Sequence, residues 1–413
     1  MTAASPIYDL VAFGATSFVG QILAGYLLEE FGAHGKLKWA AAGRSAAKLE
    51  ELRRSLGPKA AKLPLLVADA GDEAALRKMS AQTRVVASTV GPYALFGEPL
   101  VRVCAETGTD YCDLTGEPQW IRRMVDRYQD TAHASGARIV HCCGFDSIPS
   151  DLGVYFLQQE SRRRLGRPCS RVKMRVKAMR GGASGGTAAS ALNAVKEVAA
   201  NPKLRKELAN PYALCPKGHH SKVRQPDVKF VEYDTDFNGW IAPFVMGAIN
   251  TRIVHRSNAL SDHAYGVDFR YDEAVLTGKG LKGRLRAAGV AAGLAGFMAA
   301  GAIGPLRAAL ERFFLPAPGS GPSPEAQNKG FYDLRFLGLT DDGHRLMVKV
   351  TGDRDPGYGS TSKILGQAAA SLALDLAKSD VPGGIWTPAT IFGGRLFARL
   401  EKHSGLAFKV IEG

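Results

Sequence analysis

The chain has 413 residues, of which 46% are hydrophobic and 22% are charged, the composition of an ordinary globular protein. The length predicts two or three domains. The 47 glycines follow no Gly-X-Y repeat, which excludes collagen, and the six scattered cysteines indicate reduced intracellular thiols without metal-ligand spacing. Because no cysteine pair has that spacing, we expect no bound metal. No basic segment precedes the first apolar run, so we expect a cytoplasmic protein without a signal peptide.

The first 150 residues alternate between strand-like and helix-like segments. Strands are expected at residues 7–13, 37–42, 63–68, 85–90, 111–114 and 137–142, and helices at residues 18–31, 46–56, 73–81, 100–108 and 120–135. Strands that alternate with helices form parallel sheets through crossover connections. The pattern therefore predicts an α/β fold, with a Rossmann-type doubly wound parallel sheet over residues 1–150.

A glycine-rich turn connects the first strand to the first helix. Its sequence is Gly14-Ala15-Thr16-Ser17-Phe18-Val19-Gly20. Dinucleotide sites need glycines here for a tight turn, for backbone approach to the pyrophosphate and for close packing of helix on strand. The helix N-terminus then receives the pyrophosphate. We interpret the turn as a dinucleotide site; a merely tight connection is the alternative.

The end of the second strand distinguishes between the two nicotinamide cofactors. NAD sites usually carry an acidic residue there for the ribose 2′-OH, whereas this chain has Arg44, Ser45 and, one turn later, Lys48. A guanidinium forms forked hydrogen bonds with a phosphate. The sequence therefore predicts NADP(H), and an ordinary surface arginine is the alternative.

Further candidates follow the later strands at the same edge of the predicted sheet. For cofactor contacts they are Asp69, Ala70, Gly91, Pro92 and Tyr93. As proton donors we consider Tyr93, Glu117 and Asp146. The alternative role of Tyr93 is that of a packing aromatic, and the alternative roles of the two carboxylates are those of helix caps or loop ties.

The net charge of +14 comes almost entirely from the middle of the chain. Residues 1–150 carry 16 basic and 16 acidic side chains, whereas residues 151–286 carry 24 and 12. Residues 171–179 alternate cationic with apolar side chains, which predicts a half-buried strand with a cationic outer face. We expect this region to meet a lipid surface or an acidic carrier protein, with a merely solvated face as the alternative. Nucleic acid is not expected, since no known nucleic-acid-binding fold accompanies the charge.

Beyond residue 150 we expect a mixed α/β domain over residues 151–350 and a helical C-terminal segment over residues 351–413. Residues 287–306 are uncharged and rich in Ala and Gly. They are long enough to span a bilayer, but alternatives are a buried or partner-facing helix and an element on a membrane surface. Gly289 and Gly293 have the spacing that favours close helix packing.

Several motifs together resemble the saccharopine dehydrogenase-like oxidoreductases. They are GATSFVG at 14–20, AGRS at 42–45, VGPYALFGEP at 90–99, YCDLTGEPQW at 111–120, CGFDSIPSDLG at 143–153 and DPGYGSTSKILGQAA at 355–369. Within this family, the sequence looks like the branch that contains trans-acting enoyl reductases, and less like true saccharopine dehydrogenases. The resemblance implies a split Rossmann domain with helix 362–378 packed against it, and a second domain that covers the nicotinamide. It implies no assigned catalytic residue, and Ser17 departs mildly from the family turn.

From these observations we expect an NADPH-dependent oxidoreductase that reduces a C=C bond of a hydrophobic acyl or lipid substrate. In the similar branch that substrate is carried on a polyketide synthase. Two alternatives stay open: a lipid-associated scaffold that binds NADPH without turnover, and an imine-reducing amino-acid dehydrogenase. A peripheral contact with a membrane and a homodimer are further expectations.

Overall fold

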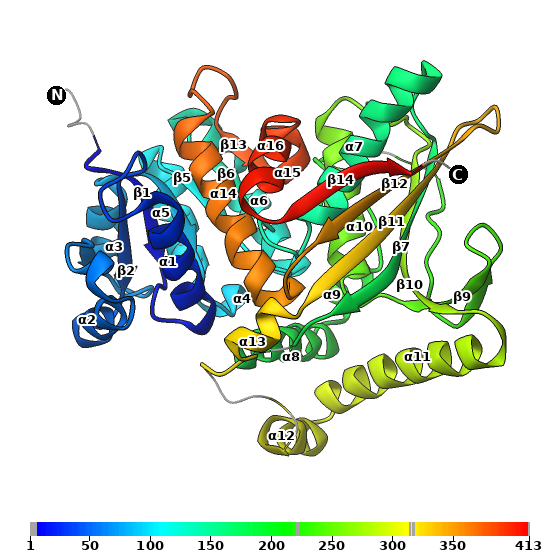
Figure 1. The fold of residues 1–413 in the computed structure, drawn as a ribbon, viewed down its shortest axis with the longest axis horizontal. Helices are drawn as coiled ribbons and strands as arrows, with labels where there is room; N and C mark the ends of the chain where they lie inside the picture. The colour runs from blue at the N-terminus through cyan, green and yellow to red at the C-terminus, as the bar shows by residue number, and fades with distance from the viewer. Residues whose placement is uncertain are drawn as a thin grey trace.

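Two seven-stranded sheets form the framework of the protein (Figure 1). The structure, a computed structural model, describes residues 6–182, 184–219, 221, 223–313, 315 and 319–411. The first sheet is parallel throughout and has the spatial order β13 (Gly384–Trp386), β6 (Arg138–Val140), β5 (Asp110–Asp113), β4 (Thr83–Ser88), β1 (Tyr8–Phe13), β2 (Trp39–Gly43) and β3 (Leu65–Val67). This is the Rossmann order with β13 added at one edge, so the predicted fold class is confirmed.

Helices cover both faces of the first sheet because its central strands are apolar on both sides. In β1, Leu10 and Ala12 pack toward one face, whereas Val11 and Phe13 pack toward the other. The helices of this domain are α1 (Phe18–Phe31), α2 (Ala46–Ser55), α3 (Glu73–Ser80), α4 (Tyr93–Phe96), α5 (Glu98–Thr107) and α6 (Pro118–Ser135), with a 3₁₀ turn at Pro58–Ala60. Side chains of α1 and α2 share one apolar core with the C-terminal helix α14 (Thr361–Leu374), and those of α3, α5 and α6 share the other.

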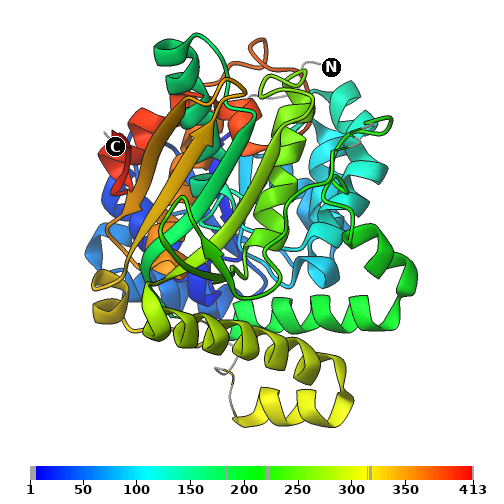
Figure 2. The ribbon, with the colours of Figure 1, turned by 90° about the vertical axis from the view of Figure 1, so that its right-hand side faces the viewer.

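The second sheet is mixed. Its order is β14 (Leu406–Ile411), β12 (Arg345–Gly352), β11 (Phe331–Leu339), β7 (Arg171–Arg180), β10 (Arg270–Gly278), β9 (Gly239–Pro243) and β8 (Glu232–Asp234). Only β7 and β10 pair in parallel. Two helices, α7 (Ile148–Leu165) and α10 (Gly247–Leu260), pack on the face that meets the Rossmann domain, and Figure 2 looks onto the opposite face.

The remaining helices lie at the periphery or in the C-terminal segment. They are α8 (Gly185–Ala200), α9 (Pro202–Leu208), α11 (Gly280–Ala302), α12 (Gly304–Phe313), α13 (Pro324–Asn328), α14 (Thr361–Leu374), α15 (Pro388–Phe392) and α16 (Arg395–His403), with a π-helical turn at Pro356–Ser360. The predicted apolar segment 287–306 is thus divided between α11 and α12.

Strand β7 alternates as predicted, but three cations on its outer side are paired. Arg175 is buried and bonds Asp234 and Asp272 at 2.7 and 2.8 Å, and Lys173 lies 2.6 Å from Asp236. Arg171 also pairs with Asp272. The prediction of a cationic outer face is wrong for these residues, because strands β8 and β10 and the turn after β8 bring acidic side chains over them.

The C-terminal segment 351–413, which we expected to be helical, also contains strands and contributes to both sheets. β13 extends the first sheet, α14 packs across its middle strands, and β14 forms an edge of the second sheet. Buried Arg138 fixes this arrangement: its guanidinium bonds Asp110 and donates to the carbonyl oxygens of Leu372, Leu376 and Ala377 at the end of α14.

We expect Arg138→Ala to lower the free energy of unfolding by about 3–5 kcal/mol, because Asp110 and three carbonyls lose a buried donor. Urea denaturation followed by circular dichroism measures the change. Arg84→Ala is the control: Arg84 lies 3.6 Å from Asp9 and is half exposed, so its loss should cost about 1 kcal/mol or less. Equal losses for the two variants would contradict this role of Arg138.

Candidate functional site

Two glycines shape the turn between β1 and α1. Gly14 has a φ of +83°, and a Cβ atom there would lie 2.7 Å from Val90 Cγ2. A Cβ atom at Gly20 would lie 2.0 Å from the carbonyl oxygen of Gly14. Neither position accepts a side chain, so strand and helix approach as closely as a dinucleotide turn requires. The first amide groups of α1 have no partner within the helix, which makes this helix N-terminus suited to bind a pyrophosphate.

Ser17 serves this turn as a helix cap. Its Oγ accepts a hydrogen bond from the Gly20 amide at 3.0 Å and lies 3.1 Å from Oγ1 of Thr89. Thr89 in turn donates to the Gly14 carbonyl at 3.0 Å. Sequence reasoning missed Thr89, since only the pairing of β1 with β4 brings it to the turn. The serine at position 17, where the family turn has glycine, thus adds a hydrogen bond between the turn after β1 and the end of β4.

The end of β2 lies against the same turn. A Cβ atom at Gly43 would stand 3.5 Å from Thr16 Oγ1. The next residue, Arg44, is exposed and makes no ion pair with any described residue. Ser45 caps α2 by accepting from the Lys48 amide at 3.3 Å, and the Lys48 side chain is exposed. Two unpaired cations therefore stand beside the turn, where a 2′-phosphate needs them.

After β3, the predicted contact residues have a local structural role. Asp69 Oδ1 accepts a hydrogen bond from the Gly71 amide at 2.8 Å, which closes a turn. The carboxylate stays exposed, and Ala70 is half-buried. An adenine contact by this loop stays a prediction.

Tyr93 lies inside the domain. Its hydroxyl donates to the Ser88 carbonyl at 2.9 Å, and its ring packs on Trp120 with centroids 5.4 Å apart. Burial raises the pKa of this hydroxyl well above its usual range, and Asp113 adds to the effect. We do not assign proton donation to Tyr93, because its hydroxyl is already bonded within the core.

Glu117 holds the loop that follows β4. Its two carboxylate oxygens accept from the amides of Tyr93 and Ala94 at 2.9 and 3.0 Å, and Ser190 of α8 donates to the same group. Burial raises the pKa of Glu117, and these bonds lower it. The carboxylate therefore positions the Gly91–Pro92 segment and has no free oxygen for proton transfer.

Asp146 differs from Glu117 in its bonding. It follows β6 and faces the loop after β5: a Cβ atom at Gly116 would lie 3.7 Å from Asp146 Oδ1. Its Oδ2 is shielded from solvent and has no hydrogen-bond partner among the described residues. Burial, with a smaller contribution from Asp113, raises the pKa of Asp146 to about 7. A carboxyl group that is populated in both its protonated and its ionised form at neutral pH suits acid–base chemistry.

A buried polar network joins this end of the sheet to the second domain. Ser147 donates to Asn250 of α10 at 2.9 Å, and the Asn250 amide donates to Ser150 and to Glu273 of β10. Tyr271 donates to the other oxygen of Glu273 at 2.6 Å. The loop that carries Asp146 is therefore fixed against α10 and β10.

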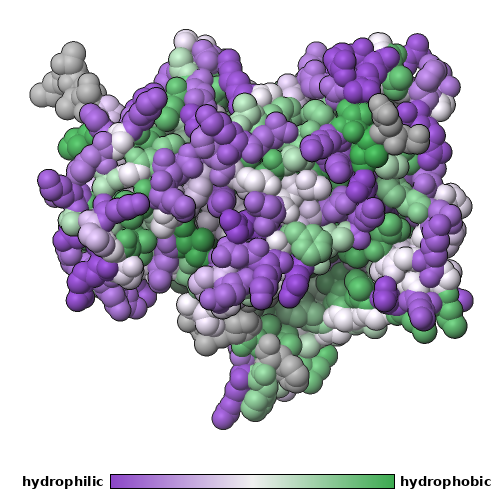
Figure 3. All heavy atoms as spheres, viewed as in Figure 1, coloured by the Kyte–Doolittle hydropathy of each residue, from purple (hydrophilic) through white to green (hydrophobic). Residues whose placement is uncertain are grey.

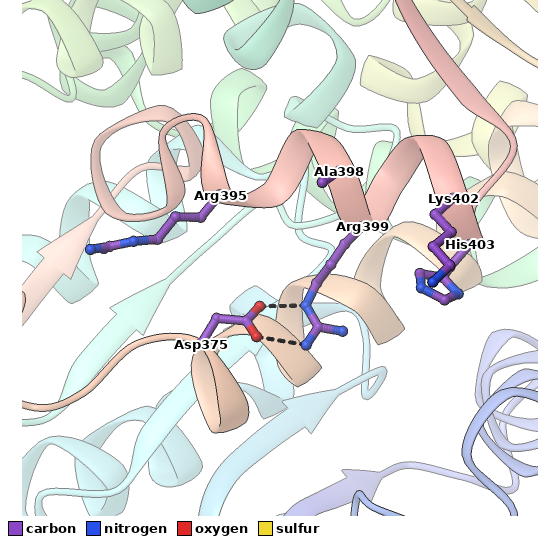
Figure 4. Close-up of a pocket in the computed structure, with 6 residues that line it drawn as sticks. All are labelled: Asp375, Arg395, Ala398, Arg399, Lys402 and His403. Carbon is purple, nitrogen blue, oxygen red and sulfur yellow. Dashed lines mark hydrogen bonds and ion pairs between the residues drawn. The ribbon is translucent and has the colours of Figure 1, made fainter.

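A surface hollow between α14 and α16 lies away from these residues (Figure 4). It is near the C-terminal end of α14 and continues to the end of α1 at Phe31, so it lies at the edge of the sheet opposite the glycine turn. Arg399 donates to Asp375 through Nε and one terminal nitrogen, and His403 bonds Glu30 at 2.5 Å. This hollow is no part of the candidate site.

Comparison with known proteins assigns the family. Residues 10–140 match the saccharopine dehydrogenase NADP-binding domain. The chain is 41% identical over 408 residues to a candidate trans-acting enoyl reductase of Mycobacterium tuberculosis, and 37% identical over 411 residues to the trans-acting enoyl reductase of Mycobacterium bovis; each alignment covers 97% of both chains. The chain belongs to the saccharopine dehydrogenase-like oxidoreductases. Apo saccharopine dehydrogenase of Saccharomyces cerevisiae has the same fold, with a TM-score of 0.54, 13% identity, and 98% of this chain and 100% of that chain covered.

As a member of this family, the protein is an NADP-dependent oxidoreductase, and the predicted cofactor is confirmed. The residues present fit that cofactor. Gly14 and Gly20 leave a cradle that a Cβ atom would fill, and Arg44 is an unpaired cation next to it. The individual contacts of the other predicted cofactor residues stay predictions.

We expect Arg44→Asp to weaken NADPH binding by about 10- to 100-fold, because a charge-assisted bond is lost and a repulsive charge is introduced. NADH binding should change little, so the preference for NADPH over NADH should narrow or reverse. Titration of cofactor fluorescence measures both dissociation constants. Arg54→Asp, at the exposed far end of α2, is the matched control, and an unchanged NADPH/NADH ratio in Arg44→Asp would exclude Arg44 as the 2′-phosphate ligand.

Proposed function

We propose that this protein reduces the C=C bond of a hydrophobic enoyl substrate with NADPH, acting in trans on an acyl chain that a separate carrier protein holds. The observation that carries the proposal is the shielded, unpartnered Oδ2 of Asp146 beside the loops after β5 and β6. The full-length similarity to trans-acting enoyl reductases supports the substrate class.

Reduction of a conjugated C=C bond needs a hydride at one carbon and a proton at the carbon next to the carbonyl. When bound, the nicotinamide supplies the hydride. Glu117 contributes by fixing the Gly91–Pro92 loop through the Tyr93 and Ala94 amides, so that this part of the site stays rigid during the reaction.

Asp146 holds the proton at its carboxyl group. With a pKa of about 7, a sizeable share of the enzyme carries the acid form at neutral pH. The O–H bond of the carboxyl breaks as the new C–H bond forms next to the substrate carbonyl, and the carboxylate then takes up a proton from water. The Ser147–Asn250 bond keeps this loop in place during the transfer.

We also propose that the enzyme works in the cytoplasm at the periphery of a membrane, where long acyl chains and their products collect. Homodimer formation stays a prediction that a measurement of mass in solution can check.

Because the acid form of Asp146 is the active one, kcat/KM for an enoyl thioester should be constant below pH 7 and fall about tenfold per pH unit well above it. Asp146→Asn should remove this dependence and lower kcat/KM by about 100-fold or more. Exposed Asp130→Asn is the control. A pH profile that survives in Asp146→Asn would exclude Asp146 as the proton donor.

The substrate class is tested by NADPH oxidation, followed by absorbance, with 2-enoyl thioesters of increasing chain length. We expect kcat/KM to rise with chain length, since each buried methylene contributes about 0.8 kcal/mol. Tight NADPH binding with no oxidation in the presence of any enoyl thioester would favour a non-catalytic scaffold. Turnover that depends on lysine and glutamate would favour an imine-reducing dehydrogenase.

A further inference from the structure

Helix α11 exposes apolar side chains where a surface helix normally carries polar ones. Leu281 and Leu285 are 70% and 63% exposed, and Ala288, Ala292 and Ala299 continue the same exposed stripe at three- to seven-residue steps. Only 11% of an apolar 18-residue stretch of this helix is buried. Among the described residues, α11 is the helix with the length and composition to cross a membrane. A helix of 23 residues is about 35 Å long, so the stripe is extensive.

The opposite side of α11 is attached to the protein. Gly283, Ala287 and Gly301 are buried, and a Cβ atom at Gly301 would lie 3.0 Å from Val195 Cγ1 of α8. The helix also packs along β9 and β10. A membrane-spanning orientation would break these contacts, so the structure favours a helix that lies flat on a surface.

The predicted close packing at Gly289 and Gly293 is wrong within this chain. No described atom lies within 4 Å of a Cβ atom built at either glycine. Both residues belong to the open side of α11, and they widen its uncharged surface.

Helix α12 extends the apolar surface. Phe313 is 72% exposed and Leu306 is half exposed. Ile303, at the junction with α11, is also half exposed. The two helices project together below the second sheet (Figure 2), and apolar side chains cover much of this projection (Figure 3). The surface of α11 and α12, residues 280–313, is called the α11–α12 face below.

The charge around this face is strongly positive. Residues 279–313 contain six Lys and Arg and a single acidic residue, Glu311; the six are Lys279, Lys282, Arg284, Arg286, Arg307 and Arg312. None of the six makes an ion pair within the described part of the chain. Arg284 instead stacks 5.3 Å over the Trp240 ring. In contrast to the paired cations of β7, these charges are available to an anionic partner.

We propose that the α11–α12 face docks the enzyme flat on an anionic lipid bilayer. The apolar stripe enters the boundary between headgroups and acyl chains, and the flanking cations bind lipid phosphates. A second copy of the chain fits less well on charge, because a symmetric contact through this face would bring two unpaired basic clusters together. An acidic protein would satisfy the cations, but not the length of the uncharged stripe.

This face lies one helix away from the candidate site. Leu192 and Val195 of α8 contact α11, while Ser190 of the same helix bonds Glu117 and lies 3.6 Å from a Cβ atom built at Gly91. Docking through α11 therefore places the loop after β4 close to the bilayer surface. The docking proposal does not rest on the proposed reduction, because lipid binding is measured without substrate.

Sedimentation with lipid vesicles tests the proposal on the full-length protein. We expect partition onto vesicles of phosphatidylcholine with about one-third phosphatidylserine to exceed partition onto pure phosphatidylcholine by about tenfold or more, and to weaken as salt rises from about 0.1 to about 0.5 M. Leu285→Glu with Ala292→Glu should reduce binding by about tenfold or more, and so should Lys282→Glu with Arg286→Glu. Val267→Glu and Lys59→Glu, at exposed positions elsewhere, are the matched controls.

An environment-sensitive dye on Ala292→Cys provides a second measurement, since the native cysteines are buried. Its emission should shift to the blue only with anionic vesicles, and shallow lipid quenchers should act more strongly than deep ones. Equal binding to both vesicle types, no binding, or quenching strongest at the bilayer centre would overturn the proposal. Loss of a dimer in Leu285→Glu with Ala292→Glu, measured by light scattering without vesicles, would overturn it in favour of a second copy.

Discussion

The carbonyl oxygen of Gly14 leaves no space for a side chain at Gly20, and the rest of the site depends on this close approach. It brings α1 directly over the end of β1, so that the helix N-terminus opens at the carboxyl edge of the sheet. Thr89 then bonds both Ser17 and Gly14, which ties β4 to the same point. The positions of the loops after β4, β5 and β6 follow from strand pairing outward from there.

The acidic residues near this edge illustrate how bonding, rather than residue type, divides their roles. Glu117 uses both oxygens on backbone amides, and Asp151 uses both on Ser257 and the Ala389 amide at 2.6 and 2.8 Å. Both carboxyl groups therefore hold neighbouring segments of the framework in place. Asp146 alone among these three keeps an unbonded, shielded oxygen. Its sequence context, between a strand and a helix, looks the same as that of Glu117.

Local pattern was sufficient for the Rossmann domain, because each of its first six strands is followed by an amphipathic or apolar helix nearby in sequence. Strand β13 was missed: it has three residues, and its partner β6 lies more than 240 residues earlier. The cations of β7 were recognised, but their acidic partners come from β8, β10 and the turn after β8, and no periodicity reveals such pairing. For the same reason, sequence placed Tyr93 near the cofactor without showing that its hydroxyl points into the core.

The return of the chain to its first domain has a consequence for its biosynthesis. Residues 6–140 alone leave one face of the parallel sheet without α14, whose Gln367 bonds Tyr26 of α1 at 2.6 Å, and leave one edge without β13. During translation, the apolar side chains that α14 covers stay uncovered until nearly the whole protein has left the ribosome. The cofactor domain is therefore first in sequence but among the last to be completed, and its assembly is coupled to that of the second sheet.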